Sequence, residues 1–337
     1  MSVGSHRNSR PFRVVVLQGG TSSEREISLQ SGAAVTAALA DRGHLVQAVD
    51  PAKTPLESVD WPRVDAAFIA LHGEFGEDGR VQALLDGWGV RYTGSDAAAS
   101  RLAFSKSASK ERFAACGVPT PRYQLVHVAD SYRHLRDAAD QLGYPLVIKP
   151  DASGSSLGVS IVDGPDDLPC AIEDCFYHGP FGLMEQAVAG TEWTLGLLDD
   201  KRLPLIRIET RQPFYDFLAK YEDEQTIYCL DHDVPSEALR AIEEAGAAAC
   251  RAVGTQGIAR VDLRVDRKFR PWVLEVNTVP GFTDHSLVPK AAARLGWTLG
   301  ELCERAVRSC LRSRSSGLTD SQNGDIQPAS APLREAG

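Results

Sequence analysis

Residues 260–286 constrain this chain more than any other stretch, because polar side chains interrupt what otherwise has the pattern of a strand pair. The pattern predicts two short strands that are joined by a charged turn at residues 266–270. Strand side chains alternate between two faces, so a hairpin brings Asp262, Glu275 and Asn277 together on one face. Carboxylate and amide oxygens are the ligands of a hard cation such as Mg²⁺. The stretch therefore predicts a metal-binding hairpin.

Two neighbours of the hairpin indicate the chemistry that the metal would serve. Arg260 adds a fixed positive charge, and the Pro-Gly step at Gly281 offers a backbone N–H. A metal, a guanidinium and a backbone amide at one point favour phosphoryl or acyl-phosphate chemistry. The alternative is an ordinary polar hairpin with solvated charges. It explains residues 266–268, but not Glu275 and Asn277, which interrupt an apolar run.

Length and composition describe a large globular protein. At 337 residues, of which 43% are hydrophobic and 24% charged, the chain can bury a large core and is predicted to hold two or three domains. The net charge of −9 argues against broad nucleic-acid affinity, and no apolar run approaches membrane-spanning length. The seven cysteines are scattered without a C-x-x-C motif, and the N-terminal residues lack the pattern of a signal peptide. We therefore expect a cytoplasmic protein without nucleic-acid or membrane partners.

The N-terminal third of the chain follows an α/β pattern. Residues 13–18, 45–49 and 66–71 have the pattern of strands in a parallel sheet, and a helix follows the glycine turn after the first strand. A strand, a glycine turn and a helix in this order also suggest dinucleotide binding. The G-x-G-x-x-G fingerprint is absent, however, which argues against that interpretation.

The loop after the third strand, at residues 72–79, contains three glycines. Open α/β sheets bind ligands beyond the carboxyl ends of their strands, and glycines let the backbone approach a ligand. We expect His72 to contribute to a site, the alternative being that it caps the loop. Residues 77 and 78 are expected to cap a helix at residues 80–88.

A second candidate for ligand binding begins at Lys149, near the end of a predicted strand. The Gly/Ser loop at residues 151–158 offers backbone N–H groups that suit phosphate oxygens, and the lysine can neutralise them. The lysine precedes the glycines, so the loop is not a Walker A motif. The alternative is a flexible surface hairpin. Residues 183–188 either bind an adenine edge, with Glu185 and Glu192 as polar partners, or form a plain sheet edge.

Propensity and composition predict the remaining segments. Residues 100–116 are expected to be helical, and residues 212–228, polar and aromatic, to form an ordered loop over a site. A helix at residues 299–311 carries an apolar stripe that indicates core packing. We expect a disordered lead-in at residues 1–12 and a disordered tail at residues 313–337.

Taken in order, these segments resemble the ATP-grasp enzymes, and closely the D-alanine–D-alanine ligases. The two most distinctive blocks are H-G-x-x-G-E-D-G at residues 72–79 and E-x-N-T-x-P-G at residues 275–281. The other blocks that carry the resemblance are GGTSSEREIS (19–28), YTGS (92–95), VIKPDASGSSLGVS (147–160), FYDFLAKY (214–221) and GIARVDL (257–263). Together they span nearly the whole chain between the two terminal segments.

The resemblance implies an ATP-grasp fold, of class α/β (α+β). An N-terminal α/β domain with a parallel sheet, which binds substrate, is expected at residues 13–104. A central ATP-grasp subdomain at residues 105–192 and a C-terminal catalytic subdomain at residues 193–312 would clamp ATP between them. The family also implies a homodimer.

The resemblance further implies which side chains bind the nucleotide and the metal. Asp262, Glu275 and Asn277 match the ligands of Mg²⁺ or Mn²⁺, with two ions expected. The residues that match ATP ligands are Lys106, Lys149, Ser156 and Lys220 for the phosphates, Glu185, Gln186 and Val188 for adenine, and Glu192 for ribose.

The implied reaction joins two D-alanine molecules to D-alanyl-D-alanine for peptidoglycan. The carboxylate of the first D-alanine attacks the γ-phosphate of ATP, and the amine of the second attacks the resulting acyl phosphate. Negative charge builds on oxygen in both steps, so positive groups and backbone N–H groups stabilise it. The residues that match this chemistry are Glu24 with Ser155 and Tyr221 at the first D-alanine, Arg260 and Gly281 at the reacting oxygens, Ser286 and Leu287 at the second D-alanine, and His72 as a further substrate contact.

Three places depart from the family pattern. Arg264 stands where an apolar residue is usual, Ala187 replaces an often larger residue, and residues 229–237 lack a Pro-Ala step. None of these removes a residue with a proposed chemical role, and Arg264 has no physical account from the sequence.

Two alternative functions stay open. A relative could join D-alanine to D-lactate or D-serine, but Tyr221 favours the dipeptide enzyme. A non-catalytic nucleotide-binding protein could lose Arg260, Asp262 or Glu275 without penalty, yet all three are present.

Overall fold

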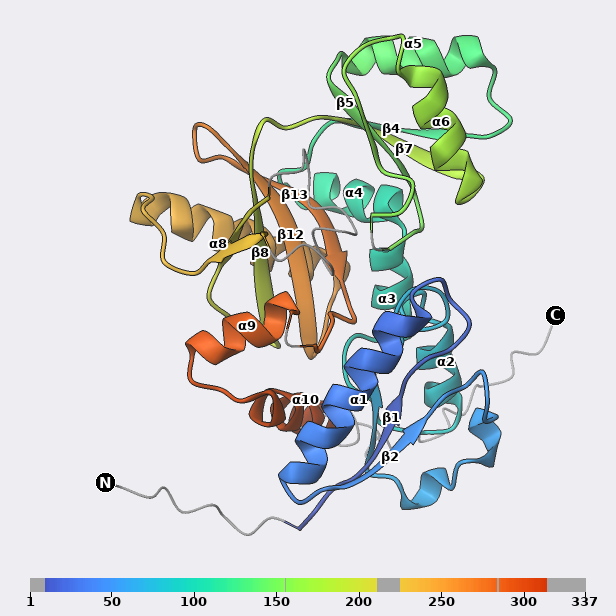
Figure 1. The fold of residues 1–337 in the computed structure, drawn as a ribbon, viewed down its shortest axis with the longest axis vertical. Coiled ribbons are helices and arrows are strands. Elements are labelled where there is room, and N and C mark those ends of the chain that lie inside the picture. Colours follow the sequence, from blue (N-terminus) through green and yellow to red (C-terminus); the bar gives the residue numbers. More distant parts are fainter. Residues whose placement is uncertain (1–9, 155, 211–224, 284, 314–337) are drawn as a thin grey trace, which may run out of the picture.

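The computed structural model describes residues 10–154, 156–210, 225–283 and 285–313. This part of the chain forms three sheets that lie one above another in an elongated molecule (Figure 1). The predictions for Ser155, Lys220, Tyr221 and most of the two terminal segments lie outside the described residues. Residues 10–12 of the predicted lead-in are described, and two of them contact the first domain: Arg10 pairs with Asp65, and Phe12 stacks on His44.

The N-terminal part is built on a parallel three-stranded sheet with the order β2-β1-β3, as predicted. The apolar run of β1 (Arg13–Leu17) is buried between β2 (Leu45–Val49) and β3 (Ala66–Ile69), because strands in parallel sheets are covered on both faces. Helix α1 (Arg25–Asp41) returns the chain from β1 to β2, and α2 (Arg80–Gly87) follows β3. The loops after β1 and β3 therefore leave the same edge of the sheet.

The central part is an antiparallel sheet with the order β4-β7-β5-β6. Two amphipathic helices pack against it and share its core, which lies at the top of the molecule in Figure 1. The elements are β4 (Tyr123–His127), α5 (Tyr132–Leu142), β5 (Leu146–Pro150), β6 (Ser160–Val162), α6 (Leu168–Tyr177) and β7 (Phe181–Gln186).

The C-terminal part contains a sheet with the order β11-β10-β8-β12-β13, to which β9 adds beside β8. Strands β12 and β13 form the antiparallel hairpin that the sequence predicted, with Asp262 directly opposite Glu275. The elements are β8 (Gly190–Leu198), β9 (Lys201–Arg202), β10 (Ile206–Glu209), β11 (Ile227–Cys229), α8 (Ser236–Val253), β12 (Ile258–Asp266) and β13 (Pro271–Asn277).

Residues 100–116 are largely helical, as expected, but the structure divides this stretch into two helices at Ser105. Helix α3 (Ala97–Phe104) ends at Ser105, and α4 (Lys106–Ala115) begins after it. Ser105 is extended, and its hydroxyl accepts a hydrogen bond from the N–H of Ala108, which makes it an N-cap. Both helices pack into the core of the C-terminal sheet, although the sequence placed them in the N-terminal and central domains.

The last two helices join the N-terminal and C-terminal parts. Helix α9 (Leu287–Arg294) lies against β8, and α10 (Leu299–Ser313) lies against α1 (Figure 1). The apolar stripe of α10 is buried, which confirms its predicted role in the core. One hydrophobic cluster contains residues of β1, β3, β8 and both helices, so the two parts share a continuous core.

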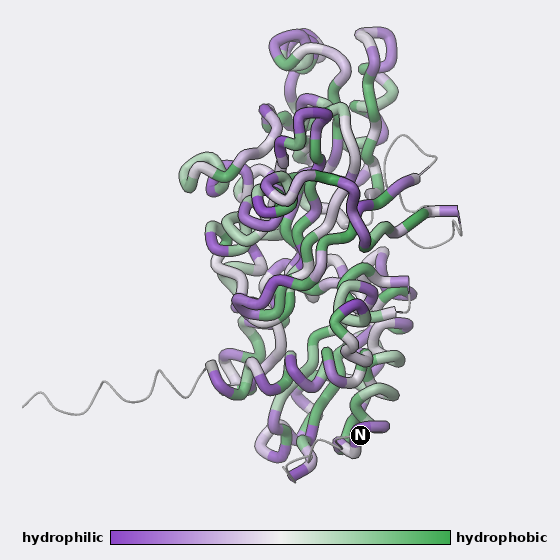
Figure 2. The backbone as a smooth tube through the Cα atoms, turned by 90° about the vertical axis from the view of Figure 1, so that its left-hand side faces the viewer, coloured by the Kyte–Doolittle hydropathy of each residue, from purple (hydrophilic) through white to green (hydrophobic). Residues whose placement is uncertain are grey.

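Hydrophobic and hydrophilic residues are spread over all three parts of the molecule (Figure 2). Among the described helices, none combines the length and the hydropathy that a membrane crossing requires. All seven cysteines are free thiols.

Candidate active site

Two cavities meet at Glu275 on β13. The first, here named the lysine cavity, lies between the central sheet and the β12–β13 hairpin and contains Lys106 and Lys149. The second, here named the Glu24 cavity, lies between the N-terminal loops and the connection from β13 to α9. Both are lined by Glu275, so a molecule that spans them passes this carboxylate.

Every described residue that the sequence assigned to the site lines one of these two cavities. The lysine cavity contains Lys106, Lys149, Ser156, Glu185, Gln186, Val188, Glu192, Asp262 and Glu275. The Glu24 cavity contains Glu24, His72, Arg260, Asn277, Gly281, Ser286, Leu287 and again Glu275. The structure thus brings together residues from the N-terminal, central and C-terminal parts of the molecule. Ser155, Lys220 and Tyr221 lie outside the described residues, and their assignments stay predictions.

The hairpin fixes Asp262 through several hydrogen bonds. Arg260 donates to both carboxylate oxygens, from Nε at 2.9 Å and from Nη2 at 2.8 Å, and Thr194 Oγ1 donates at 2.8 Å. The amide of Asn277 donates to the same carboxylate at 3.2 Å. Asp262 is largely buried, so these donors offset the cost of removing its charge from water.

The chemistry of this cluster fits a hard cation. Asp262 and Glu275 supply carboxylate oxygens from neighbouring strands, and Asn277 adds an amide oxygen on the same face. No group of three or more His, Cys, Asp and Glu side chains with metal-binding geometry occurs in the described ranges. A set of only three side-chain oxygens suits Mg²⁺, which keeps waters and substrate phosphates among its ligands.

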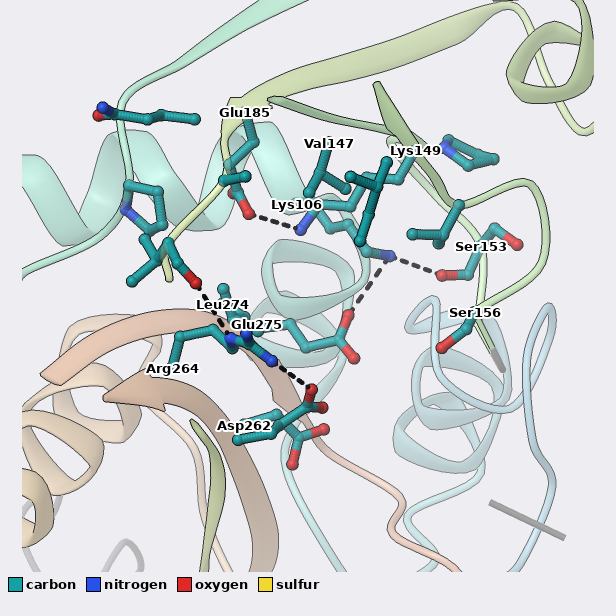
Figure 3. A pocket seen from close by; sticks show the side chains of 18 of the residues that line it. Lys106, Val147, Lys149, Ser153, Ser156, Glu185, Asp262, Arg264, Leu274 and Glu275 are labelled. Carbon is teal, nitrogen blue, oxygen red and sulfur yellow. Dashed lines mark hydrogen bonds and ion pairs between the residues drawn. The ribbon is translucent and has the colours of Figure 1, made fainter. Parts of the chain in front are cut away.

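Two lysines approach the hairpin from the opposite side of the lysine cavity (Figure 3). Lys106, the first residue of α4, donates to the backbone oxygen of Ser153 at 2.6 Å and lies 3.5 Å from the carboxylate of Glu275. Lys149, on β5, lies 3.2 Å from Glu185. Both lysines are nearly buried, so each is held by carboxylate or backbone oxygens rather than by solvent.

A further lysine, Lys110, lies beneath this cavity and was not predicted from the sequence. Its side chain is fully buried, pairs with Glu185 and donates to Thr120 Oγ1 at 2.5 Å. Burial lowers the pKa of Lys110 to about 8, against the opposing effect of Glu185. Lys110 follows Lys106 by one helical turn, and this i,i+4 spacing is the signal that could have revealed it.

Glu185 is the common partner of two lysines. Burial alone would raise the pKa of its carboxyl, but the charges and hydrogen bonds of Lys110 and Lys149 lower it below its usual value. The side chain is 3% exposed and engaged by the lysines. What the segment from Glu185 to Val188 offers to a ligand is therefore mainly its backbone.

Glu24 lies in a space that two glycines leave open. A Cβ atom at Gly154 would lie 2.4 Å from Glu24 Oε2, and one at Gly73 would lie 2.8 Å from it. A side chain at either position would displace this carboxylate, so the two glycines leave room for Glu24 in its present place. Glu24 thus links the loop after β1, the loop after β3 and the Gly/Ser loop.

His72 lines the Glu24 cavity, and its role in the site stays a prediction. Its Nε2 lies 3.1 Å from Ser31 Oγ, and its Nδ1 lies 3.3 Å from the carboxylate of Glu77. Glu77 therefore contacts His72, and the expectation that it caps α2 is wrong. Burial raises the pKa of Glu77, although its hydrogen bond with His72 acts against the shift. Asp78 does accept the N–H of Arg80 at the helix start.

The connection from β13 to α9 forms the far wall of the Glu24 cavity. Ser286 lies at the N-terminus of α9, where its hydroxyl accepts the N–H of Thr283 at 3.0 Å. A Cβ atom at Gly281 would lie 2.6 Å from this hydroxyl, so Gly281 lets the two segments approach. A helix N-terminus beside a hydroxyl favours an anionic group such as a carboxylate.

The chain is similar in sequence to known proteins over most of its length. The family model of the D-alanine–D-alanine ligase N-terminus matches residues 47–95, and that of the C-terminus matches residues 113–308. The D-alanine–D-alanine ligase of Halorhodospira halophila is 45% identical over 309 residues, which cover 90% of this chain and 97% of that protein. The enzyme of Nitrosomonas europaea is 44% identical over 290 residues, covering 86% of this chain and 94% of that protein.

The solved structures agree with the sequence comparison. The D-alanine–D-alanine ligase of Bacillus anthracis, complexed with ATP, superposes with a TM-score of 0.80 at 31% identity, covering 91% of this chain and 99% of that chain. On these matches, the chain belongs to the D-alanine–D-alanine ligase family of the ATP-grasp superfamily.

Proposed function

We propose that the protein joins two D-alanine molecules in an ATP-dependent reaction that passes through an acyl phosphate. The observation that carries this proposal is the meeting of the two cavities at Glu275. One cavity presents lysines, which suit phosphates, and the other presents a carboxylate, a guanidinium and a helix N-terminus, which suit an amino acid. An acyl phosphate forms where a phosphate and a carboxylate meet, so the junction is the place for the reaction.

The lysine cavity takes ATP. Lys106 and Lys149, with the Gly/Ser loop at Ser156, neutralise the phosphates, and Lys220 joins them in the proposal. The backbone of the segment from Glu185 to Val188, with Gln186 beside it, holds the adenine. Glu192 accepts hydrogen bonds from the ribose hydroxyls.

Asp262, Glu275 and Asn277 would hold Mg²⁺ or Mn²⁺, and two ions are expected from the resemblance to the family. When bound, such ions supply positive charge to the phosphate oxygens. Arg260, which is held in place by Asp262, adds its guanidinium on the side of the Glu24 cavity.

The Glu24 cavity takes the two amino acids. Glu24 binds the ammonium group of the first D-alanine, and Ser155 and Tyr221 complete this network in the proposal. Ser286 and the N-terminus of α9, with Leu287 beside them, bind the carboxylate of the second D-alanine. The N–H of Gly281 and the guanidinium of Arg260 stabilise the oxyanion that forms when the amine attacks. His72 closes the cavity from below.

The product, D-alanyl-D-alanine, serves peptidoglycan synthesis, and so contributes to the cell wall and to cell shape. ATP and D-alanine are metabolites of the cytoplasm, and free thiols suit that compartment. We therefore also propose a cytoplasmic location. A homodimer is the assembly state that the proposal carries over from the family.

Substrate pairing tests the function directly. Release of ADP is measured with D-alanine, D-serine and D-lactate, singly and in pairs, at two pH values. We expect turnover with D-alanine alone, and D-alanyl-D-alanine as the main product when the three compete. A preference for D-lactate at neutral pH, or turnover that does not depend on D-alanine, would contradict the proposal.

A further inference from the structure

Arg264 lies in the wall of the lysine cavity, on the same face of β12 as Arg260 and Asp262. The strand register places it directly opposite Glu192 of β8. Opposite charges on directly paired residues of neighbouring strands attract each other, and here Arg264 Nη1 lies 3.5 Å from Glu192 Oε2. The two side chains are 21% and 12% exposed, so solvent screens the pair only in part.

The same guanidinium also holds the chain that connects β7 to β8. Nη2 donates to the backbone oxygen of Gly190 at 2.8 Å, and Nε donates to that of Val188 at 3.3 Å. Figure 3 shows Arg264 between the hairpin and this connection. Arginine is the side chain that can donate in several directions at once from a rigid planar group. A methionine or leucine here would leave both backbone oxygens without these donors.

We propose that Arg264 is a positioning residue for the nucleotide, which fixes the backbone at Val188 and the carboxylate of Glu192 where adenine and ribose bind. This inference rests on the proposed function, because that function assigns the lysine cavity to ATP. Arg264 acts through its neighbours. It fixes the distance between the β7–β8 connection and the hairpin, and it orients the carboxylate of Glu192. The chemistry at Glu275 does not involve it.

Arg264→Met tests the proposal, because methionine keeps the length of the side chain and removes the donors. We expect the KM for ATP to rise about tenfold, with kcat and the KM for D-alanine changed less than about twofold. Arg264→Lys keeps the charge, but its single ammonium group cannot donate to all three acceptors as the planar guanidinium does. Its KM for ATP should therefore lie between those of the wild type and Arg264→Met. Arg267→Met is the matched control: Arg267 is exposed at the turn of the same hairpin, and its loss should change neither KM.

The ribose gives a readout that a merely structural role would not move. The KM values for ATP, 2′-deoxy-ATP and 3′-deoxy-ATP are compared in the wild type, in Glu192→Gln, in Arg264→Met and in the double variant. The wild type should prefer ATP to at least one deoxy nucleotide, and Arg264→Met should lose most of that preference. In the Glu192→Gln background, Arg264→Met should cost clearly less than it does alone, because coupled residues are not additive.

Three results would overturn the inference. The first is an unchanged ribose preference in Arg264→Met, and the second is the absence of a ribose preference in the wild type. The third is a KM for ATP in the double variant that rises by the product of the factors seen in Glu192→Gln and in Arg264→Met. Binding of a non-hydrolysable ATP analogue, measured without D-alanine, separates this outcome from failure of the proposed function. If the wild type turns over D-alanine and Arg264→Met binds the analogue as tightly as the wild type, the inference fails and the function stands. If the wild type does not turn over D-alanine, the function fails, while the binding comparison still reports on Arg264.

Discussion

The substitution Glu275→Gln is expected to lower phosphate release in the presence of D-alanine by about 100- to 1,000-fold. Glutamine keeps the shape of the side chain but removes a negative charge from the point where the two cavities meet. The hairpin then presents a single carboxylate, that of Asp262, and Lys106 loses the carboxylate that lies 3.5 Å from it. Both changes weaken the binding and positioning of the positive groups that stabilise charge on the transferred phosphate.

Phosphate release is measured with saturating ATP, D-alanine and Mg²⁺, and again across a Mg²⁺ titration. The variant should need more Mg²⁺ for half-maximal rate, since the proposed metal site would lose a carboxylate ligand. Glu237→Gln, at an exposed position on α8, is the control and should behave as the wild type. Wild-type turnover in Glu275→Gln would show that the metal assignment is wrong.

The substitution Lys110→Met is expected to lower the free energy of unfolding by about 3 kcal/mol, because it removes one partner of a buried ion pair. Glu185 is 3% exposed and would keep Lys149 as its remaining cation. Thr120 would also lose the ammonium group that donates to it. Chemical denaturation measures the effect. Lys53→Met, at an exposed position in the N-terminal part, is the control and should leave stability unchanged.

The double variant Lys110→Met/Glu185→Gln separates charge from packing. If the buried charge causes the loss, neutralising Glu185 should recover part of the stability, because a neutral amide costs less to bury than a carboxylate that lacks one of its partners. The stability loss of the double variant is compared with the losses of the two single variants. If it equals their sum, the two residues act independently and the ion pair contributes no stability.

The pH dependence of stability gives a second test of Lys110. Its pKa is lowered from 10.5 to about 8 in the folded protein, so between these two values the unfolded chain binds more protons than the folded chain. The contribution of this group to the free energy of unfolding therefore rises with pH through that window. The stability difference between the wild type and Lys110→Met should widen as the pH is raised from 8 towards 10. A constant difference would contradict the lowered pKa.

The sequence predicted the strand pair β12–β13 because its signals are local. A charged turn between two alternating segments defines a hairpin, and the period of two places Asp262 and Glu275 on one face. The parallel N-terminal sheet was also predictable, since short apolar strands separated by helices leave few other arrangements. In both cases the pattern of residues close together in the sequence is enough to predict the structure.

The break between α3 and α4 was not predicted, because residues 100–116 lack glycine or proline before Gly117. Ser105 ends one helix and caps the next, and a serine in a helical pattern is a weak signal. The break matters for the site because it places Lys106 in the first turn of α4, within reach of Ser153 and Glu275.

For a related reason the buried Lys110 was not predicted, and the half-buried Glu77 was given a capping role that the structure contradicts. Lys110 contacts Glu185, which is distant in the sequence, and Glu77 turns towards His72 instead of capping α2. Burial is a property of the assembled molecule, and a charged residue in sequence is more often solvated than paired inside. The presence of an arginine at position 264 is explained only by the register of β12 against β8, which places it opposite Glu192.

The central claim is that a carboxylate is activated by phosphate at Glu275, and oxygen transfer tests it most directly. D-Alanine labelled with ¹⁸O in its carboxylate is incubated with ATP and the enzyme, and the released phosphate is analysed by mass spectrometry. Attack of the carboxylate on the γ-phosphate forms a C–O–P bridge, and the later attack of the amine breaks the bond between carbon and the bridging oxygen. The account predicts that the phosphate carries a labelled oxygen for each dipeptide formed. Dipeptide accompanied by unlabelled phosphate would contradict it.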